Sequence, residues 1–240
     1  MKITKHIPNA ITSMNLLSGV LGIVFAFRGM PVAAFGLMLA ASVFDYLDGF
    51  CARLLGAYSP MGKELDSLSD MVSFGVLPAL MLYCYMDGLS LGPWCWISLS
   101  VAVFSGLRLA KFNIDDRQSD NFIGMPTPSV AIICGSLACL ASCKPDSFVA
   151  HWCQTIWFVP AVSLLLSSLL VCEVPFFAMK IKKGGLKEDR FHFLKLAFFV
   201  VIAITVPTVL LTGIHFSAGI LVVFFFYILE SLLAFVFRRG

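Results

Sequence analysis

Apolar stretches of about 20 residues follow one another along this chain of 240 residues, and they constrain its fold more than any other feature. A helix of that length and composition spans the hydrocarbon core of a bilayer. Only 13% of the residues are charged, whereas a soluble domain carries about 25%. We therefore predict an all-helical integral membrane protein with a single membrane-embedded domain, residues 1–240, rather than a soluble helical protein.

Turn-forming residues separate eight predicted transmembrane helices. Gly29-Met30-Pro31 forms a tight turn, and Pro126 with Pro128 opens the fifth helix, where a missing N–H does little harm. Residues 1–9 are expected to form a short surface helix. Three prolines are expected to kink the apolar helices in which they fall, namely Pro160, Pro175 and Pro207. The predicted transmembrane helices are 10–28, 30–55, 62–86, 94–113, 126–143, 154–179, 192–212 and 216–237.

Basic residues are divided unevenly between the two sides of this arrangement. Of the 17 Lys and Arg residues, 15 lie at the two termini or in the second, fourth and sixth connections. Only Arg28 and Lys144 lie on the opposite side. The positive-inside rule then places both termini and the basic loop 180–195 in the cytoplasm.

Four aspartates stand in a run of 26 residues between two apolar stretches: Asp45-x2-Asp48-Gly49-x2-Ala52-Arg53-x8-Gly62-x3-Asp66-x3-Asp70. Asp45 and Asp48 are three residues apart, and Asp66 and Asp70 are four apart, so each pair shares one helix face. The short connection around 56–61 predicts that the two helices are antiparallel neighbours. The four carboxylates are therefore expected to converge at the cytoplasmic surface of the membrane.

Four carboxylates in one place repel one another and require cations. Oxygen ligands without His or Cys favour Mg²⁺, Mn²⁺ or Ca²⁺ over zinc. Gly49, Gly62 and Ala52 leave room for a ligand, and Arg53 can form paired hydrogen bonds with phosphate oxygens. Metal ions and an arginine beside a lipid phase indicate a diphosphate site, where two metals can stabilise charge during displacement at phosphorus.

Two other interpretations of the acidic run remain. The aspartates could form a solvated acidic loop or cap helices, although this leaves the glycine, alanine and arginine spacing unexplained. Alternatively, an ion-coupled transporter binds its ion through intramembrane carboxylates, but those would lie nearer the membrane midplane.

The cysteines and histidines give no sign of a second site. The eight cysteines lie in or beside apolar helices, and no C-x-x-C occurs. We therefore interpret them as buried small hydrophobic residues. The four histidines are scattered without ligand spacing.

The acidic run matches the signature of the CDP-alcohol phosphotransferases, D-x2-D-G-x2-A-R-x8-G-x3-D-x3-D, and the chain resembles this family on eight fixed residues. The resemblance implies transfer of a phosphatidyl-type group from a CDP-linked lipid to an alcohol, with release of CMP. It also implies a homodimer, six core helices and a two-metal site, with Mg²⁺ or Mn²⁺ as the expected ions.

The resemblance also implies roles for single residues. Asp70 resembles the general base that takes the proton of the acceptor hydroxyl, with Asp66 beside it in the catalytic group. The implied metal ligands are Asp45, Asp48, Asp66 and Asp70. The implied contacts to the CDP moiety are Asp45, Gly49, Ala52, Arg53, Gly62 and Asp66. Thr12 and Asn15, on a polar stripe of the first helix, could meet the nucleotide or the second helix.

Other segments resemble one branch of the family, the phosphatidylserine synthases of the bacterial membrane type. These segments are Pro8-Asn9-x2-Thr12-x2-Asn15, Ser73-Phe74-Gly75-x2-Pro78-Ala79, Arg108-Leu109-Ala110-Lys111-Phe112-Asn113 and Phe122-x-Gly124-Met125-Pro126-Thr127-Pro128. L-Serine is zwitterionic, so its carboxylate needs a cation and its ammonium an acceptor. The residues expected to bind serine are Arg108, Lys111, Asn113, Thr127 and Ser73.

The sequence and the resemblance together predict an enzyme of a bacterial inner membrane that makes phosphatidylserine from CDP-diacylglycerol and L-serine. Its active site is expected to face the cytoplasm, among membrane lipids and without a nucleic-acid partner. The alternatives are another acceptor, glycerol 3-phosphate or an inositol phosphate, or an archaeal-type lipid donor. Acceptors with an extra phosphate would demand more clustered basic residues near the aspartates.

Overall fold

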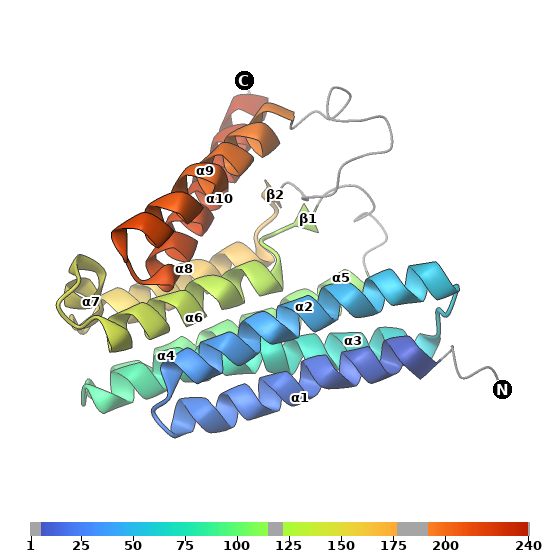
Figure 1. The fold of residues 1–240 in the computed structure, drawn as a ribbon, viewed down its shortest axis with the longest axis horizontal. Helices are drawn as coiled ribbons and strands as arrows, with labels where there is room; N and C mark the ends of the chain where they lie inside the picture. Colours follow the sequence, from blue (N-terminus) through green and yellow to red (C-terminus); the bar gives the residue numbers. More distant parts are fainter. Residues whose placement is uncertain (1–5, 115–121, 177–191, 240) are drawn as a thin grey trace.

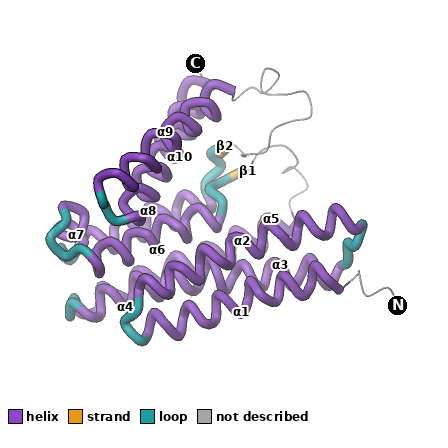
Figure 2. Tube along the Cα trace, viewed as in Figure 1, coloured by secondary structure: helices purple, strands orange, loops and turns teal. Residues whose placement is uncertain are grey.

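The structure of the protein, a computed structural model, describes residues 6–114, 122–176 and 192–239, which are almost entirely helical (Figures 1 and 2). The first half contains α1 (Ile7–Phe27), α2 (Pro31–Leu55), α3 (Pro60–Asp70), α4 (Leu77–Gly88) and α5 (Ser100–Ile114). The second half contains α6 (Thr127–Cys143), α7 (Phe148–Cys153), α8 (Phe158–Val171), α9 (His192–Thr212) and α10 (Phe216–Arg239). A π-helical segment, Met71–Val76, joins α3 to α4, and a 3-10 segment, Gly92–Leu99, precedes α5.

The helices form a bundle with a hairpin laid across it. Helices α1 to α5 run side by side along the long axis in Figure 1, and α6 and α8 lie next to them. The core is built where α6 packs against α2 and α4, and its central residues Phe35, Met38, Phe74 and Leu82 are fully buried. Helices α9 and α10 pair with each other, and α10 packs on α6 at a steep angle.

Local chemistry sets most helix ends. Gly29 has φ +68°, a conformation that side chains disfavour, and Pro31 then begins α2. Gly56 ends α2 in the left-handed conformation, and the Ser59 hydroxyl accepts a hydrogen bond from the Gly62 N–H at the start of α3. The expected turn at Gly29 and the expected proline opening of α6 are thus confirmed.

The predicted helix 154–179 is wrong at both ends, because α8 spans only Phe158–Val171. The chain after α8 is held by a segment far away in sequence: Met125 N–H donates to the Leu169 carbonyl at 2.8 Å, and Gly124 N–H to the Val174 carbonyl at 3.0 Å. Two short antiparallel strands follow from this pairing, β1 (Phe122–Ile123) and β2 (Pro175–Phe176).

The expected proline kinks are only partly present. Pro175 lies in β2 and therefore kinks no helix. Pro160 lies in the first turn of α8, where no N–H is needed, whereas Pro207 does fall inside α9. Residues 7–9 of the expected surface helix belong to α1, and residues 1–5 lie outside the described part of the chain.

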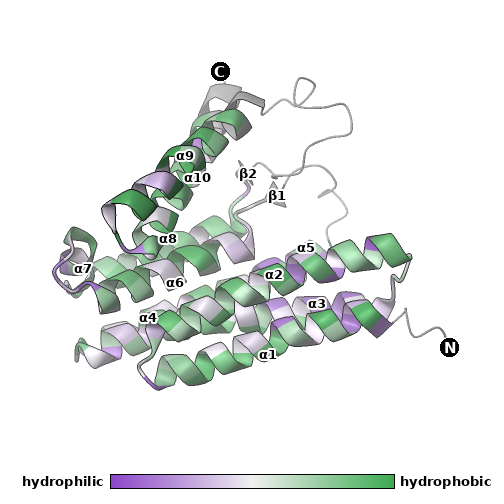
Figure 3. Cartoon of the chain, in the orientation of Figure 1, coloured by the Kyte–Doolittle hydropathy of each residue, from purple (hydrophilic) through white to green (hydrophobic). Residues whose placement is uncertain are grey.

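Apolar surface identifies the protein as an integral membrane protein. Five helical segments are long and apolar enough to span a membrane: Ile7–Phe27, Pro31–Leu55, Pro60–Gly88, Gly92–Ile114 and Phe216–Leu233. Thr127–Cys143, Phe158–Val171 and Leu196–Thr212 are apolar but shorter. Large exposed side chains such as Leu54, Val103 and Leu164 lie on these helices, and hydrophobic residues dominate them in Figure 3. Most of the predicted basic loop 180–195 lies outside the described residues.

Candidate active site

Helix α1 packs against both helices that carry the aspartates. It packs against α2 and against α3, whereas α2 and α3 have little direct contact. The two helices nevertheless bring their carboxylates together, as expected, because Asp45, Asp48 and Asp66 meet across them. Since α1 packs on both helices, its own polar residues also reach this site.

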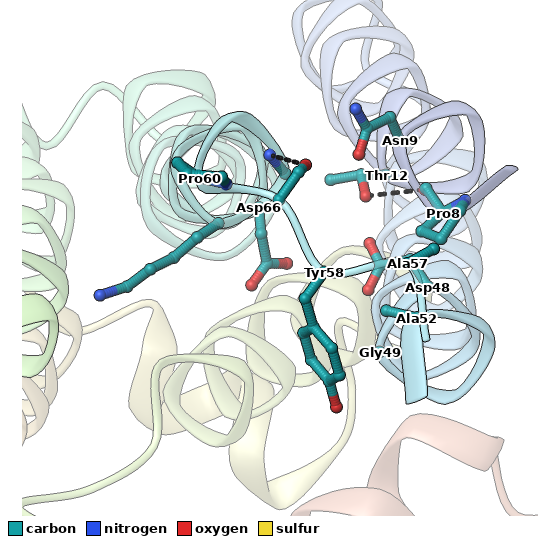
Figure 4. A pocket seen from close by; sticks show the side chains of 13 residues that line it. Pro8, Asn9, Thr12, Asp48, Gly49, Ala52, Ala57, Tyr58, Pro60 and Asp66 are labelled. Atoms are coloured by element: carbon teal, nitrogen blue, oxygen red, sulfur yellow. Dashed lines mark hydrogen bonds between the residues drawn. The ribbon is translucent and has the colours of Figure 1, made fainter. Parts of the chain in front are cut away.

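A cavity of about 520 Å³ opens at this end of the bundle (Figure 4). Its wall includes much of the predicted CDP-binding set, namely Asp48, Gly49, Ala52, Gly62, Asp66 and Thr12. The same wall includes Asn9, which shares the polar stripe of Thr12 and Asn15, and residues that were not expected in the site, namely Pro8, Ala57, Tyr58, Ser59, Pro60 and Lys63. In Figure 4 the carboxylates of Asp48 and Asp66 point into the same space from opposite helices. The first turn of α1, the end of α2 and the start of α3 thus form one pocket.

Three of the four aspartates form a tight cluster. Carboxylate oxygens of Asp45, Asp48 and Asp66 lie within 4.8 Å of one another. Asp48 Oδ2 and Asp66 Oδ1 are buried and accept no hydrogen bond from the described residues. Buried carboxylate oxygens at this spacing repel one another and are costly without a partner. The cluster therefore fits a divalent cation with oxygen ligands.

Asp70 lies beside this cluster but is held differently. The Asn15 amide donates to Asp70 Oδ1 at 3.4 Å, which connects α1 to the end of α3. The π-helical segment Met71–Val76 begins immediately after Asp70. Such segments are rare and occur frequently at functional sites. Asn15, predicted to meet the nucleotide or the second helix, thus contacts the predicted base.

The absence of a side chain matters for different reasons at two glycines of the signature. A Cβ on Gly62 would lie 2.9 Å from Asn9 Oδ1 and 3.0 Å from Ser59 Oγ, so the cap and α1 leave no space for it. A Cβ on Gly49 would meet Arg53 Nη1 at 3.5 Å, an ordinary contact, and would otherwise occupy the cavity. Packing therefore accounts for Gly62, whereas Gly49 keeps the cavity wide.

Cationic groups stand at the rim of the cavity. Arg53 is exposed, and its Nη1 atom lies beside Gly49. Lys63 lines the cavity, and its ammonium donates to the Asn113 carbonyl at 3.4 Å. Lys63 follows Gly62 directly, so a basic residue inside the signature was the signal that could have identified it.

A second polar group lies near Asp70. Arg108 is only 7% exposed, and its Nη1 donates to Thr127 Oγ1 at 2.7 Å. Asp70 and Tyr227 lie near enough to the Arg108 guanidinium to interact with it electrostatically. A buried arginine normally has a partner, so this cluster of α5, α6 and α10 is an organised polar site. The sequence predicted Arg108 and Thr127 together, but it gave no reason to include Tyr227.

The other residues predicted to bind serine are placed differently. The Asn113 amide donates to Ser67 Oγ at 2.9 Å, which joins α5 to α3. Ser73 is fully buried, and its hydroxyl donates to the Asn15 carbonyl at 3.1 Å. Ser73 therefore holds the π-helical segment against α1. Lys111 is half-buried and lies one turn beyond Arg108 on α5.

Comparisons with known proteins identify the family of the chain. A sequence model of the CDP-alcohol phosphatidyltransferase family matches residues 5–165. The chain is 40% identical over 177 residues to a CDP-diacylglycerol–serine O-phosphatidyltransferase of Mycobacterium leprae (strain TN), which covers 70% of the chain and 57% of that relative. It is 38% identical over 125 residues to a protein of the same name from Bacillus subtilis (strain 168), covering 51% and 70%.

A relative with a different name also matches. An archaetidylserine synthase of Methanothermobacter thermautotrophicus is 39% identical over 146 residues, covering 56% of the chain and 59% of the relative. The alignments with the mycobacterial relatives span 57% to 60% of the length of those proteins. The family match includes the aspartate cluster, Arg108 and Thr127, and it ends before α9 and α10.

Proposed function

Because the chain belongs to the CDP-alcohol phosphatidyltransferase family, we propose that it transfers the phosphatidyl group of CDP-diacylglycerol to the hydroxyl of L-serine, giving phosphatidylserine and CMP. The observation that carries this proposal is the convergence of the Asp45, Asp48 and Asp66 carboxylates, of which Asp48 and Asp66 line the cavity, with Asp70 and the buried Arg108 next to them.

The donor is proposed to bind in the cavity between α1, α2 and α3. Divalent ions, Mg²⁺ or Mn²⁺, would be held by Asp45, Asp48 and Asp66 together with Asp70, and would neutralise the charge of the diphosphate. Gly49 and Ala52 leave room for the cytidine diphosphate, and Gly62 allows α3 to approach α1 closely. Arg53 at the rim offers a planar set of donors for phosphate oxygens.

The acceptor is proposed to bind between Asp70 and Arg108. The Arg108 guanidinium pairs with the serine carboxylate, while Thr127 holds the guanidinium in place. Asp70, oriented by Asn15, takes the proton of the serine hydroxyl. The serine oxygen then bonds to the lipid-side phosphorus as the bond from that phosphorus to CMP breaks, and CMP leaves with the electron pair.

The arrangement in the membrane is part of the same proposal. We place eight transmembrane helices in a bacterial inner membrane, with six in the catalytic core and both termini in the cytoplasm. The basic side of the chain supports this orientation. The cavity then opens toward cytoplasmic serine, while membrane lipids supply the donor. The active unit is proposed to be a homodimer.

For the lipid part of the donor, the comparisons support a second candidate beside diacylglycerol. A relative named archaetidylserine synthase is about as similar to the chain as the relatives named for CDP-diacylglycerol. The described cavity contains the residues for the headgroup, which both donors share. An archaeal-type CDP-lipid is therefore a second candidate donor, with serine still the acceptor.

Release of CMP tests the proposal directly. Purified protein in detergent is given CDP-diacylglycerol and Mn²⁺ or Mg²⁺, with serine, glycerol 3-phosphate or inositol phosphate in separate reactions. We expect CMP only with serine. Asp70→Asn should abolish turnover in a folded protein, while Glu64→Gln, on an exposed acid of the same helix, should not. CMP release with another acceptor but not serine, or full turnover by Asp70→Asn, would refute the assignment.

A further inference from the structure

Two cysteines and a histidine meet at the end of α6 that lies away from the aspartate cavity. Cys139 and Cys143 are four residues apart in the last turns of α6 and share one face. His215 lies in the connection between α9 and α10, which reaches this end of α6 in Figure 1. The sulfur atoms of the two cysteines and a ring nitrogen of His215 lie within 4.8 Å of one another. This distance allows all three to share one ion.

The surroundings of the cluster also suit an ion. The Ser217 hydroxyl is fully buried and lies 2.7 Å from His215 Nδ1, and it also hydrogen-bonds Cys139. A metal-binding histidine usually gives its second ring nitrogen to such a partner, which fixes the tautomer. If Ser217 accepts the Nδ1 proton, Nε2 keeps the lone pair that an ion needs.

The cluster has an entry path and a distinct ligand chemistry. A cavity of about 650 Å³ opens beside it and is lined by Cys143 and His215. Two thiolates and an imidazole select soft ions such as Zn²⁺ over Mg²⁺ and Mn²⁺. Around tetrahedral zinc, bonds of about 2.0–2.3 Å place ligand atoms about 3.3–3.8 Å apart, so small side-chain rotations suffice. A water molecule can take the fourth position.

We propose that Cys139, Cys143 and His215 bind a thiophilic metal ion of the Zn²⁺ class, which ties the α9–α10 hairpin to α6. This hairpin lies outside the region matched by the family, and its main attachment is the packing of α10 on α6. A metal at the hairpin connection adds a second attachment. Since α10 carries Tyr227 to Arg108, the ion would also stabilise the position of that side chain.

Cobalt spectroscopy tests this site independently of phosphatidyl transfer. The full chain in detergent, kept reduced with a phosphine and saturated with Mg²⁺ to fill the aspartate site, is titrated with Co²⁺. We expect a thiolate-to-cobalt charge-transfer band and the visible bands of tetrahedral Co²⁺, saturating at a single ion per chain, and their loss when Zn²⁺ is added. Asp48→Asn should keep these bands, because it alters only the carboxylate cluster.

Matched cysteine variants make the result specific. The double variant Cys139→Ala/Cys143→Ala should lose the charge-transfer band, and His215→Gln should weaken binding. The control Cys84→Ala/Cys172→Ala changes two other half-buried cysteines and should keep the band. Zn²⁺ should raise the thermal unfolding temperature of the wild type and the control but not of the double variant. If the double variant does not fold, Cys143→Ala alone gives the same comparison. The absence of a band in the wild type, or an unchanged band without Cys143, would overturn the proposal.

Discussion

Replacing Arg108 by lysine separates recognition of serine from binding of the lipid donor. Arg108 is 7% exposed and donates to Thr127 at 2.7 Å, which holds its planar guanidinium in one orientation. Lysine keeps the charge but loses the paired geometry. A hydrogen bond to a charged group contributes about 1.5–3 kcal/mol, and about 1.4 kcal/mol is a factor of ten, so we expect kcat/KM for serine to fall about 10- to 140-fold.

The assay measures CMP release while each substrate is varied in turn. With saturating CDP-diacylglycerol, Arg108→Lys should show its loss mainly in the KM for serine. With saturating serine, the KM for CDP-diacylglycerol should stay within about twofold, because Arg108 does not line the donor cavity.

Arg28→Lys provides the control for this change. Arg28 is exposed and caps the C-terminal end of α1, whereas the donor cavity lies at the N-terminal end of that helix. The same chemical replacement there should leave both KM values unchanged. Equal losses for both substrates in a folded Arg108→Lys protein would show that Arg108 only stabilises the bundle. An unchanged kcat/KM for serine would refute its assignment to the acceptor.

Three further predictions follow from the packing and the cavity. Gly49→Ala should raise the KM for CDP-diacylglycerol without lowering the unfolding temperature, because its Cβ would enter the cavity and meet only Arg53 at 3.5 Å; a lower unfolding temperature with normal KM would contradict this. Gly19→Val should destabilise the fold by about 1–3 kcal/mol, seen in thermal unfolding, because even a Cβ there would lie 3.0 Å from Ser73 Cα. Asp48→Asn should raise the Mn²⁺ concentration needed for half-maximal CMP release at least about tenfold, since it removes one oxygen ligand from the cluster. An identical Mn²⁺ titration curve would exclude Asp48 as a ligand.

The sequence alone determined the features that depend on neighbouring residues. Prolines at the first turns of α2 and α6 and the left-handed Gly29 fix local backbone conformation, so they marked these boundaries correctly. The three- and four-residue spacing of the aspartates places each pair on one helix face through the helical period. Hydrophobic length predicted eight membrane helices, and five helical segments of the described chain are long and apolar enough to span a membrane, whereas α6, α8 and Leu196–Thr212 in α9 are shorter.

Only the tertiary structure decided how these local elements meet. The helix after residue 158 ends at Val171 because backbone groups of Gly124 and Met125 bond to that region, which no local signal reveals. The packing of α1 on α3 brings Asn15 to Asp70, and α6 with α10 brings Thr127 and Tyr227 to Arg108. The approach of His215 to Cys139 and Cys143 depends on the same kind of packing. Helical period and turn chemistry act over a few residues, whereas these contacts depend on how complete helices pack, and spacing along the chain carries little information about that.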